Sequence, residues 1–130
     1  MSLVQRVSEL AARIGDVVAT KIDANHPGVA RAWVCFGYVS NQIVVRSSHN
    51  VTSVTRLGSG RYRVTFATPM PDANYCWTAL ARSSVDSGQQ RIAVIRATSD
   101  AKTAQHVDVS CATAASSFAD SSEINLMVFR

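Results

Sequence analysis

The chain has 130 residues, of which 47% are hydrophobic and 17% are charged. These values are typical of one folded domain with its own core and exclude a disordered chain. The net charge is +4, but the cations are dispersed and almost all are arginines, so we expect ion pairs with carboxylates rather than a nucleic-acid partner.

Membrane insertion and secretion are not expected from the sequence. It has no run of 18 apolar residues, and its first residues lack the pattern of a signal peptide. We therefore expect synthesis in a reducing cytoplasm, where Cys35, Cys76 and Cys111 stay mostly as buried thiols. A disulfide between chains, formed after release from the cell, is left open. No CxxC spacing supports zinc, and we expect neither a metal ion nor a cofactor.

Residues 1–24 carry a helical pattern. Apolar side chains recur at alternating spacings of four and three residues, the pattern of a coiled-coil seam: Leu3, Val7, Leu10, Ile14 and Val17. Ser2 can cap the start, and Asn-His-Pro-Gly at 25–28 cannot continue the helix.

Such a short seam is marginal as an isolated coiled coil. The helix could pack on its own domain, but the sequence beyond it is almost wholly β-like, which favours self-association. β-Branched residues occur at both seam positions and favour three strands over two, without settling the number.

The hydrophobic period changes to two from residue 32 onward, as in β-strands. Eight short segments rich in Val, Ile, Thr and aromatic residues are predicted strands: 32–38, 42–46, 50–57, 61–67, 74–82, 91–98, 105–112 and 123–129. Their spacing predicts an antiparallel β-sandwich or jelly-roll-like domain over 32–130, joined to the helix by a linker at 25–31.

Turn signals join two of these strands and end the second. Gly-Ser-Gly at 58–60 predicts a hairpin with a three-residue loop. Pro69 and Pro71 then take the chain out of the sheet, because proline cannot donate to the ladder. Asp72 and Asn74 can close this corner with side-chain hydrogen bonds.

Five short motifs follow one another between residues 31 and 77. They are an Ala-Trp-Val-x-Phe strand, an Asn-Val-x-Ser-hydrophobic strand, a Gly-x-Gly turn, a Tyr-x-Val-x-Phe strand and a Met-Pro-x-Ala-Asn-Tyr corner. The matching residues are Ala32, Trp33, Val34, Phe36, Asn50, Val51, Ser53, Val54, Gly58, Gly60, Tyr62, Val64, Phe66, Met70, Pro71, Asp72, Ala73, Asn74 and Tyr75. This order resembles the β-domain of bacteriophage virion fibre and tail proteins. The chain departs from that pattern at Cys35, His49 and Arg61.

The resemblance implies a non-enzymatic protein of the virion surface, usually a trimer with a helix bundle and β-domain around one axis. The expected role is a fibre or adhesin subunit that takes part in host attachment. The alternative is a capsid decoration, cement or head-fibre protein that stabilises the shell. The expected partners are further copies of the chain, other tail or capsid proteins and, for an adhesin, a host-surface glycan or protein.

A glycan-cleaving enzyme is the remote alternative. It would need converging carboxylates, for which the candidates are Asp86, Asp100, Asp108, Asp120 and Glu123, with Asp86 and Asp108 as the two to substitute in a test. Asp108 shares a strand face with His106, a pairing more typical of an exposed salt link. Trp33 and Trp77 lie in strand patterns, where packing in the core or between subunits is expected. Ligand recognition would fall to the loops 83–90 and 113–121, with the candidate residues Asp86, Gln89, Gln90 and Phe118.

Overall fold

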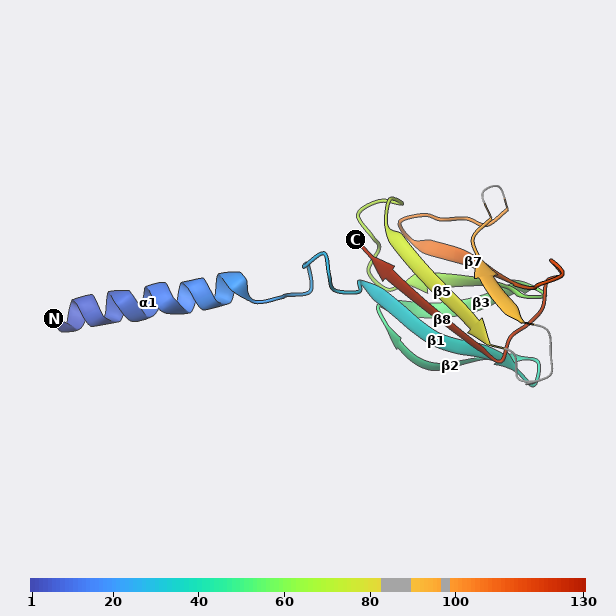
Figure 1. The fold of residues 1–130 in the computed structure, drawn as a ribbon, viewed down its shortest axis with the longest axis horizontal. Coiled ribbons are helices and arrows are strands. Elements are labelled where there is room, and N and C mark those ends of the chain that lie inside the picture. The colour runs from blue at the N-terminus through green and yellow to red at the C-terminus, as the bar shows by residue number, and fades with distance from the viewer. Residues whose placement is uncertain (83–89, 97–98) are drawn as a thin grey trace.

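The computed structural model describes residues 1–82, 90–96 and 99–130, in which one helix is followed by eight strands (Figure 1). The elements are α1 (Leu3–Thr20), β1 (Ala32–Val39), β2 (Gln42–His49), β3 (Val51–Gly58), β4 (Arg61–Phe66), β5 (Cys76–Arg82), β6 (Arg91–Val94), β7 (His106–Thr113) and β8 (Glu123–Phe129). A mainly β chain with one N-terminal helix is therefore confirmed. Within these residues, no helix is both long and apolar enough to cross a membrane.

The strands form two antiparallel sheets of four strands each. Sheet A has the order β2-β1-β8-β5, and sheet B has the order β3-β4-β7-β6. Alternate residues of both sheets point into one common core, as in a sandwich. The buried core residues are Ala32, Val34, Phe36, Tyr62, Val64, Phe66, Met70, Tyr75, Val107, Val109, Cys111, Ile124, Leu126 and Val128.

Strand β4 shows the predicted alternation most clearly. Tyr62, Val64 and Phe66 are buried, whereas the residues between them are partly exposed. Near the centre of the core, Tyr62 meets Phe36 of the opposite sheet edge to face, with ring centroids 5.3 Å apart. Such aromatic contacts add to the stability that burial alone provides.

The boundaries of three predicted elements need correction. Helix α1 ends at Thr20, before the sequence that was expected to stop it, and Lys21 caps it in an extended conformation. Strand β2 continues beyond residue 46 because its pairing with β1 extends to His49. Strand β6 ends at Val94 rather than 98, because the Arg96 amide donates to the Asp100 carboxylate instead of a neighbouring strand.

The β3–β4 turn is shorter than predicted. Gly58 pairs with Arg61, which leaves Ser59 and Gly60 as a two-residue turn, so the prediction of a three-residue loop is wrong. Gly60 has a φ of +66°, a conformation that glycine adopts without steric penalty. A Cβ atom at Gly60 would lie 2.4 Å from the Cys111 carbonyl oxygen, whereas one at Gly58 would meet nothing within 4 Å.

Asn50 fastens the proline corner to the start of the domain. Its side-chain amide donates to the carbonyl oxygens of Arg31 and Thr68, both at 3.1 Å, and its oxygen accepts from the Thr68 amide at 2.6 Å. The turn predicted at Asp72 forms, with the Asn74 amide donating to the Asp72 carboxylate at 2.8 Å. These bonds explain why polar residues occupy both ends of the corner.

We predict that Gly60→Ala lowers the free energy of unfolding by about 1–3 kcal/mol, through the left-handed backbone and the contact with Cys111. Gly58→Ala is the matched control and should change it by less than about 0.5 kcal/mol, because the added methyl group has open space. Urea unfolding followed by circular dichroism measures both. Equal effects of the two substitutions would contradict this account of the turn.

Candidate functional site

The apolar seam of α1 faces solvent along its whole length. Ser2 caps the helix through a capping box with Gln5. The seam consists of Leu3, Val7, Leu10, Ile14 and Val17, which are between 55% and 76% exposed. None of the residues of α1 is buried, and Figure 1 shows the helix standing away from the two sheets. The helix therefore does not pack on the described part of its own domain.

The exposed face is wider than a two-residue seam. Val4, Ala11 and Val18 fall one position after the Leu3, Leu10 and Val17 row, so each heptad carries three apolar positions rather than two. Val4 and Val18 are 75% and 65% exposed. An apolar stripe of this width is typical of a helix that contacts more than one neighbour.

The helix needs a covering partner for a physical reason. It has 18 residues, so its length is about 27 Å. Isolated helices of this size are marginal in water, because most helical stability in proteins comes from packing of an apolar face. The apolar face of α1 is thus the most prominent candidate interaction surface.

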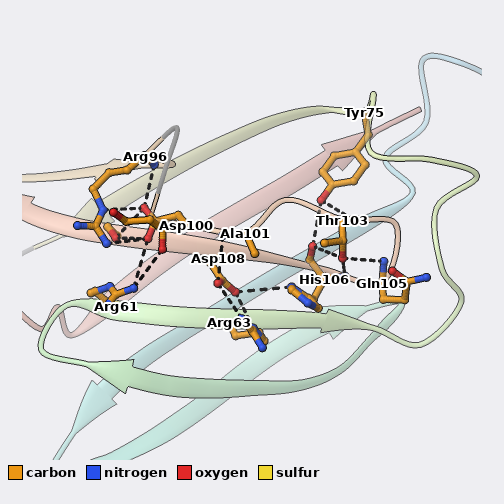
Figure 2. Close-up of polar contacts among 12 residues, drawn as sticks. Arg61, Arg63, Tyr75, Arg96, Asp100, Ala101, Thr103, Gln105, His106 and Asp108 are labelled. Atoms are coloured by element: carbon orange, nitrogen blue, oxygen red, sulfur yellow. Dashed lines mark hydrogen bonds and ion pairs between the residues drawn. The ribbon is translucent and has the colours of Figure 1, made fainter.

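A second candidate is the polar cluster on the outer face of sheet B (Figure 2). The Asp100 carboxylate accepts hydrogen bonds from Arg96 Nε, Arg96 Nη2 and the Arg96 amide at 2.8–3.0 Å. It also accepts from Ser110 Oγ on β7, and Arg61 Nη2 lies 3.8 Å away. Burial alone would raise the pKa of Asp100, but the bonds from Arg96 and Ser110 outweigh burial and lower it.

Asp108, two residues before Ser110 on β7, also has its carboxylate occupied by donors of the chain. It accepts from Arg63 Nε at 2.7 Å, from Arg63 Nη2 at 3.0 Å and from the Ala101 amide at 3.2 Å. His106 Nδ1 lies 3.7 Å from the carboxylate, and the Asp108 side chain is only 4% exposed. The prediction of an exposed His106–Asp108 link is therefore wrong, because the loop 99–105 covers this face and Arg63 is the main partner.

The cluster works as a latch that fastens the loop to sheet B. The Asp108 amide donates to the Ala101 carbonyl oxygen at 2.7 Å. The Tyr75 hydroxyl donates to the carbonyl oxygens of Thr103 and His106. Figure 2 shows these contacts along the length of β7. The loop is thereby held at several points, which explains why outward residues of β7 are buried.

A third carboxylate, Asp120, organises the β3–β4 turn. It accepts from Arg56 Nε and Nη2 at 3.1 and 2.7 Å, from the Gly60 amide at 2.9 Å and from the Tyr62 hydroxyl at 2.6 Å. Burial alone would raise its pKa, but the bonds from Arg56, Tyr62 and Gly60 lower it to about 2. Sequence reasoning missed this role, because Asp120 is far from the turn in the chain.

The chemistry of the three carboxylates is that of anchors. A general acid needs a raised pKa and a free oxygen directed at a substrate. Here Asp100, Asp108 and Asp120 have lowered pKa values, and each is occupied by donors of the chain itself. Within the described residues, no group of three or more His, Cys, Asp or Glu side chains is placed to hold a metal ion.

Of the residues predicted for ligand loops, the structure describes Gln90 and Phe118. Asp86 and Gln89 lie outside the described residues, and Gln90 is exposed just before β6. Phe118 is 43% exposed, and the Arg96 guanidinium stacks 4.6 Å from its ring centroid. A hollow of about 300 Å³ lies beside Phe118, lined mainly by apolar side chains of β6 and of the chain around 112–116.

The cysteines and tryptophans occupy more varied positions than predicted. All three cysteines are free thiols, but only Cys111 is buried, with its pKa raised to about 11 by burial. Cys35 is partly buried and Cys76 is exposed, so the prediction of buried thiols is wrong for Cys76. Trp77 packs against the core, whereas Trp33 lies on the outer face of β1 beside His49.

Comparison with known proteins identifies no relative. No protein-family model, no curated protein and no solved structure matches the chain.

We predict that Asp120→Asn lowers the stability of the protein most above pH 4 and least near pH 2. The folded-state pKa of Asp120 lies below its ordinary value of 3.8, so its contribution is full above about pH 4 and is lost as the pH falls towards 2. The difference in unfolding free energy between the parent and the variant should shrink by about 1–2 kcal/mol over this range. The other carboxylates contribute equally to the unfolding free energy of both proteins, so their contributions cancel in this difference.

Urea unfolding at a series of pH values measures that difference. Asp16→Asn is the matched control, because Asp16 is an exposed carboxylate on α1, away from the bonds that hold Asp120. A difference for Asp120→Asn that does not change between pH 4 and pH 2 would show that the bonds from Arg56, Gly60 and Tyr62 do not stabilise the ionised carboxylate.

Proposed function

We propose that the protein is a non-enzymatic structural subunit of the bacteriophage virion surface, which assembles as a trimer through α1 and carries its β-sandwich as a fibre or adhesin-type module for host attachment. The observation that carries the proposal is the wholly exposed apolar face of α1, held apart from a sandwich that has its own core. A trimeric coiled coil and a jelly-roll-like form of the sandwich are parts of this proposal.

The virion context is supported by the motif order between residues 31 and 77. In the fold, these motifs form a connected scaffold rather than a set of scattered matches. Phe36 and Tyr62 meet in the core, and Gly60 and Asn50 sit at positions that need a left-handed backbone. Each of these residue types has a structural reason to occur where the resemblance places it.

The non-enzymatic part of the proposal is supported by the saturation of the carboxylates. Asp108, one of the two carboxylates that a glycan-cleaving enzyme would use, is bound by Arg63 and by the Ala101 amide. The other, Asp86, lies outside the described residues. In a structural role, such carboxylates hold segments of the chain together, as those on the outer face of sheet B hold the loop 99–105.

The location of the subunit can be tested directly on virus particles. Antibodies raised against the purified protein should label the tail or its fibres in electron micrographs of intact virions. Purified protein should then bind envelopes of the host bacterium and not empty capsids. Binding to empty capsids, with labelling of the head, would assign the alternative role of capsid decoration. Absence of the protein from purified virions would overturn both.

We predict that Leu10→Glu converts the trimer into monomers by placing a charge in the middle of the seam. The concentration of half-dissociation should rise by at least about a hundredfold, because an unpaired charge would be buried in the assembled helices. Ala12→Glu is the matched control on the opposite side of α1 and should leave the assembly intact. Sedimentation over a concentration series measures both.

Two outcomes would contradict the prediction. A parent protein that is monomeric at all concentrations would rule out self-association. A trimer that Leu10→Glu leaves unchanged would mean that α1 serves attachment to another protein and that the trimer forms elsewhere.

A further inference from the structure

The outer faces of the two sheets differ in how they are covered. The loop 99–105 lies over the outside of sheet B, so that Asp108 and Ser110 of β7 are buried. On the outside of sheet A, Leu80 of β5 is 73% exposed and Met127 of β8 is 44% exposed. In Figure 1 this face turns towards the viewer and lies open over the middle of β5, β8 and β1.

The open face of sheet A is uncharged in its middle. The strand register aligns two rows of outward side chains across β1, β8 and β5, one in the order Trp33, Met127, Thr78 and the other in the order Cys35, Asn125, Leu80. We call these six residues the sheet A face. A groove of about 350 Å³ runs between β1 and β8 and is lined by four of them with Val34 and Leu126.

Two ion pairs within the chain border the ends of the sheet A face, and beside β1 Arg46 Nη2 donates to the Ser122 carbonyl oxygen at 2.7 Å. Arg82 and Glu123 form an ion pair of 3.1 Å at the end of the face far from the helix. Arg130 and Asp72 form one of 2.7 Å at the end near the linker. A second copy in parallel orientation would therefore meet an uncharged band between two neutralised rims, which is the charge pattern that fits the same face of another copy.

The chain enters the sandwich next to the middle strands of this face. Strands β1 and β8 are the two central strands of sheet A, and the chain passes from the linker directly into β1. The Arg31 amide donates to the Val128 carbonyl oxygen at 2.7 Å, which fixes the entry of the chain against β8. Because the linker at 21–31 leads directly into β1, association of the helices would bring the β1 and β8 strands of neighbouring copies within reach of one another.

The area available to the assembly points the same way. The apolar stripe of α1 measures about 27 Å by 10 Å. Three strands of seven residues cover about 23 Å by 14 Å. A stable interface buries roughly 800 Å² on each partner, which the helix stripe alone does not reach and which the two surfaces together approach.

We propose that the sheet A face is a second self-association surface, which packs against the same face of the neighbouring copies in the assembly that α1 begins. This inference rests on the self-association in the proposed function, because the helices bring the copies together. The proposed function does not say which side of the sandwich faces the axis of the assembly, and this inference assigns that side to sheet A. The outer face of sheet B and the loop tips then point away from the axis.

The test introduces charge into the face of the full chain. Leu80→Arg should raise the concentration of half-dissociation by about tenfold or more, because a central interface residue would be replaced by an unpaired charge. Leu80 is exposed in the single chain, so the variant should fold, and circular dichroism checks this. Ser53→Arg on the outer face of sheet B is the matched control and should leave the concentration unchanged.

A second measurement uses a native thiol of the face. With Cys76 replaced by serine, a short bismaleimide should link the Cys35 side chains of neighbouring copies, since Cys111 is buried. Cross-linked chains should appear in the Cys76→Ser protein. They should be lost when Leu80→Arg is added to it, at the same protein concentration.

The outcomes separate this inference from the proposed function. If Leu10→Glu gives monomers while Leu80→Arg changes neither the assembly nor the cross-linking, the sheet A face is not an interface and the helical trimer stands. If Leu80→Arg keeps its assembly but is no longer incorporated into virions, the face belongs to another virion protein and the inference is overturned. A parent protein that is monomeric at all concentrations overturns both.

Discussion

The contact of Tyr62 with both the core and a carboxylate is the interaction on which most of the structure depends. Its ring meets Phe36 across the two sheets, and its hydroxyl donates to Asp120 at 2.6 Å. Burying a tyrosine hydroxyl is unfavourable unless it finds a partner, and here the partner is an anion with three further hydrogen bonds. Sheet packing, the β3–β4 turn and the chain before β8 are thereby fixed together.

In the described residues, the buried carboxylates of the sandwich are paired within the chain, whereas α1 buries none of its apolar side chains. Arg63 and Arg96 are used inside the fold to hold carboxylates on sheet B. These ion pairs agree with the arginine–carboxylate pairing that the dispersed cations of the sequence predict. Exposed apolar side chains lie on α1 and on sheet A. Burying them against protein would lower the free energy through the hydrophobic effect.

A sandwich stabilised by internal ion pairs, with apolar surfaces left exposed, agrees with the proposed assembly of several copies. The bonds of Asp100 and Asp108 hold the loop 99–105 on sheet B, and a preorganised surface loses less entropy on association. In the proposed assembly, the apolar surfaces of α1 and of sheet A, on either side of the chain's entry at Arg31, would contact the same neighbour. An assembly held in this way gains strength from linking the two surfaces, since the first contact raises the effective concentration for the second.

Local periodicity predicts the eight strands, the alternation of Tyr62 with its neighbours and the heptad pattern of α1. The roles of the carboxylates depend on the fold, since Asp120 and Gly60 are 60 residues apart along the chain and meet only in space. It also shortened the Gly58–Gly60 turn, buried Asp108 under a loop and left Leu80 exposed. Periodicity predicts which side chains share a face of a strand or helix. Whether that face is buried depends on segments that are distant in sequence.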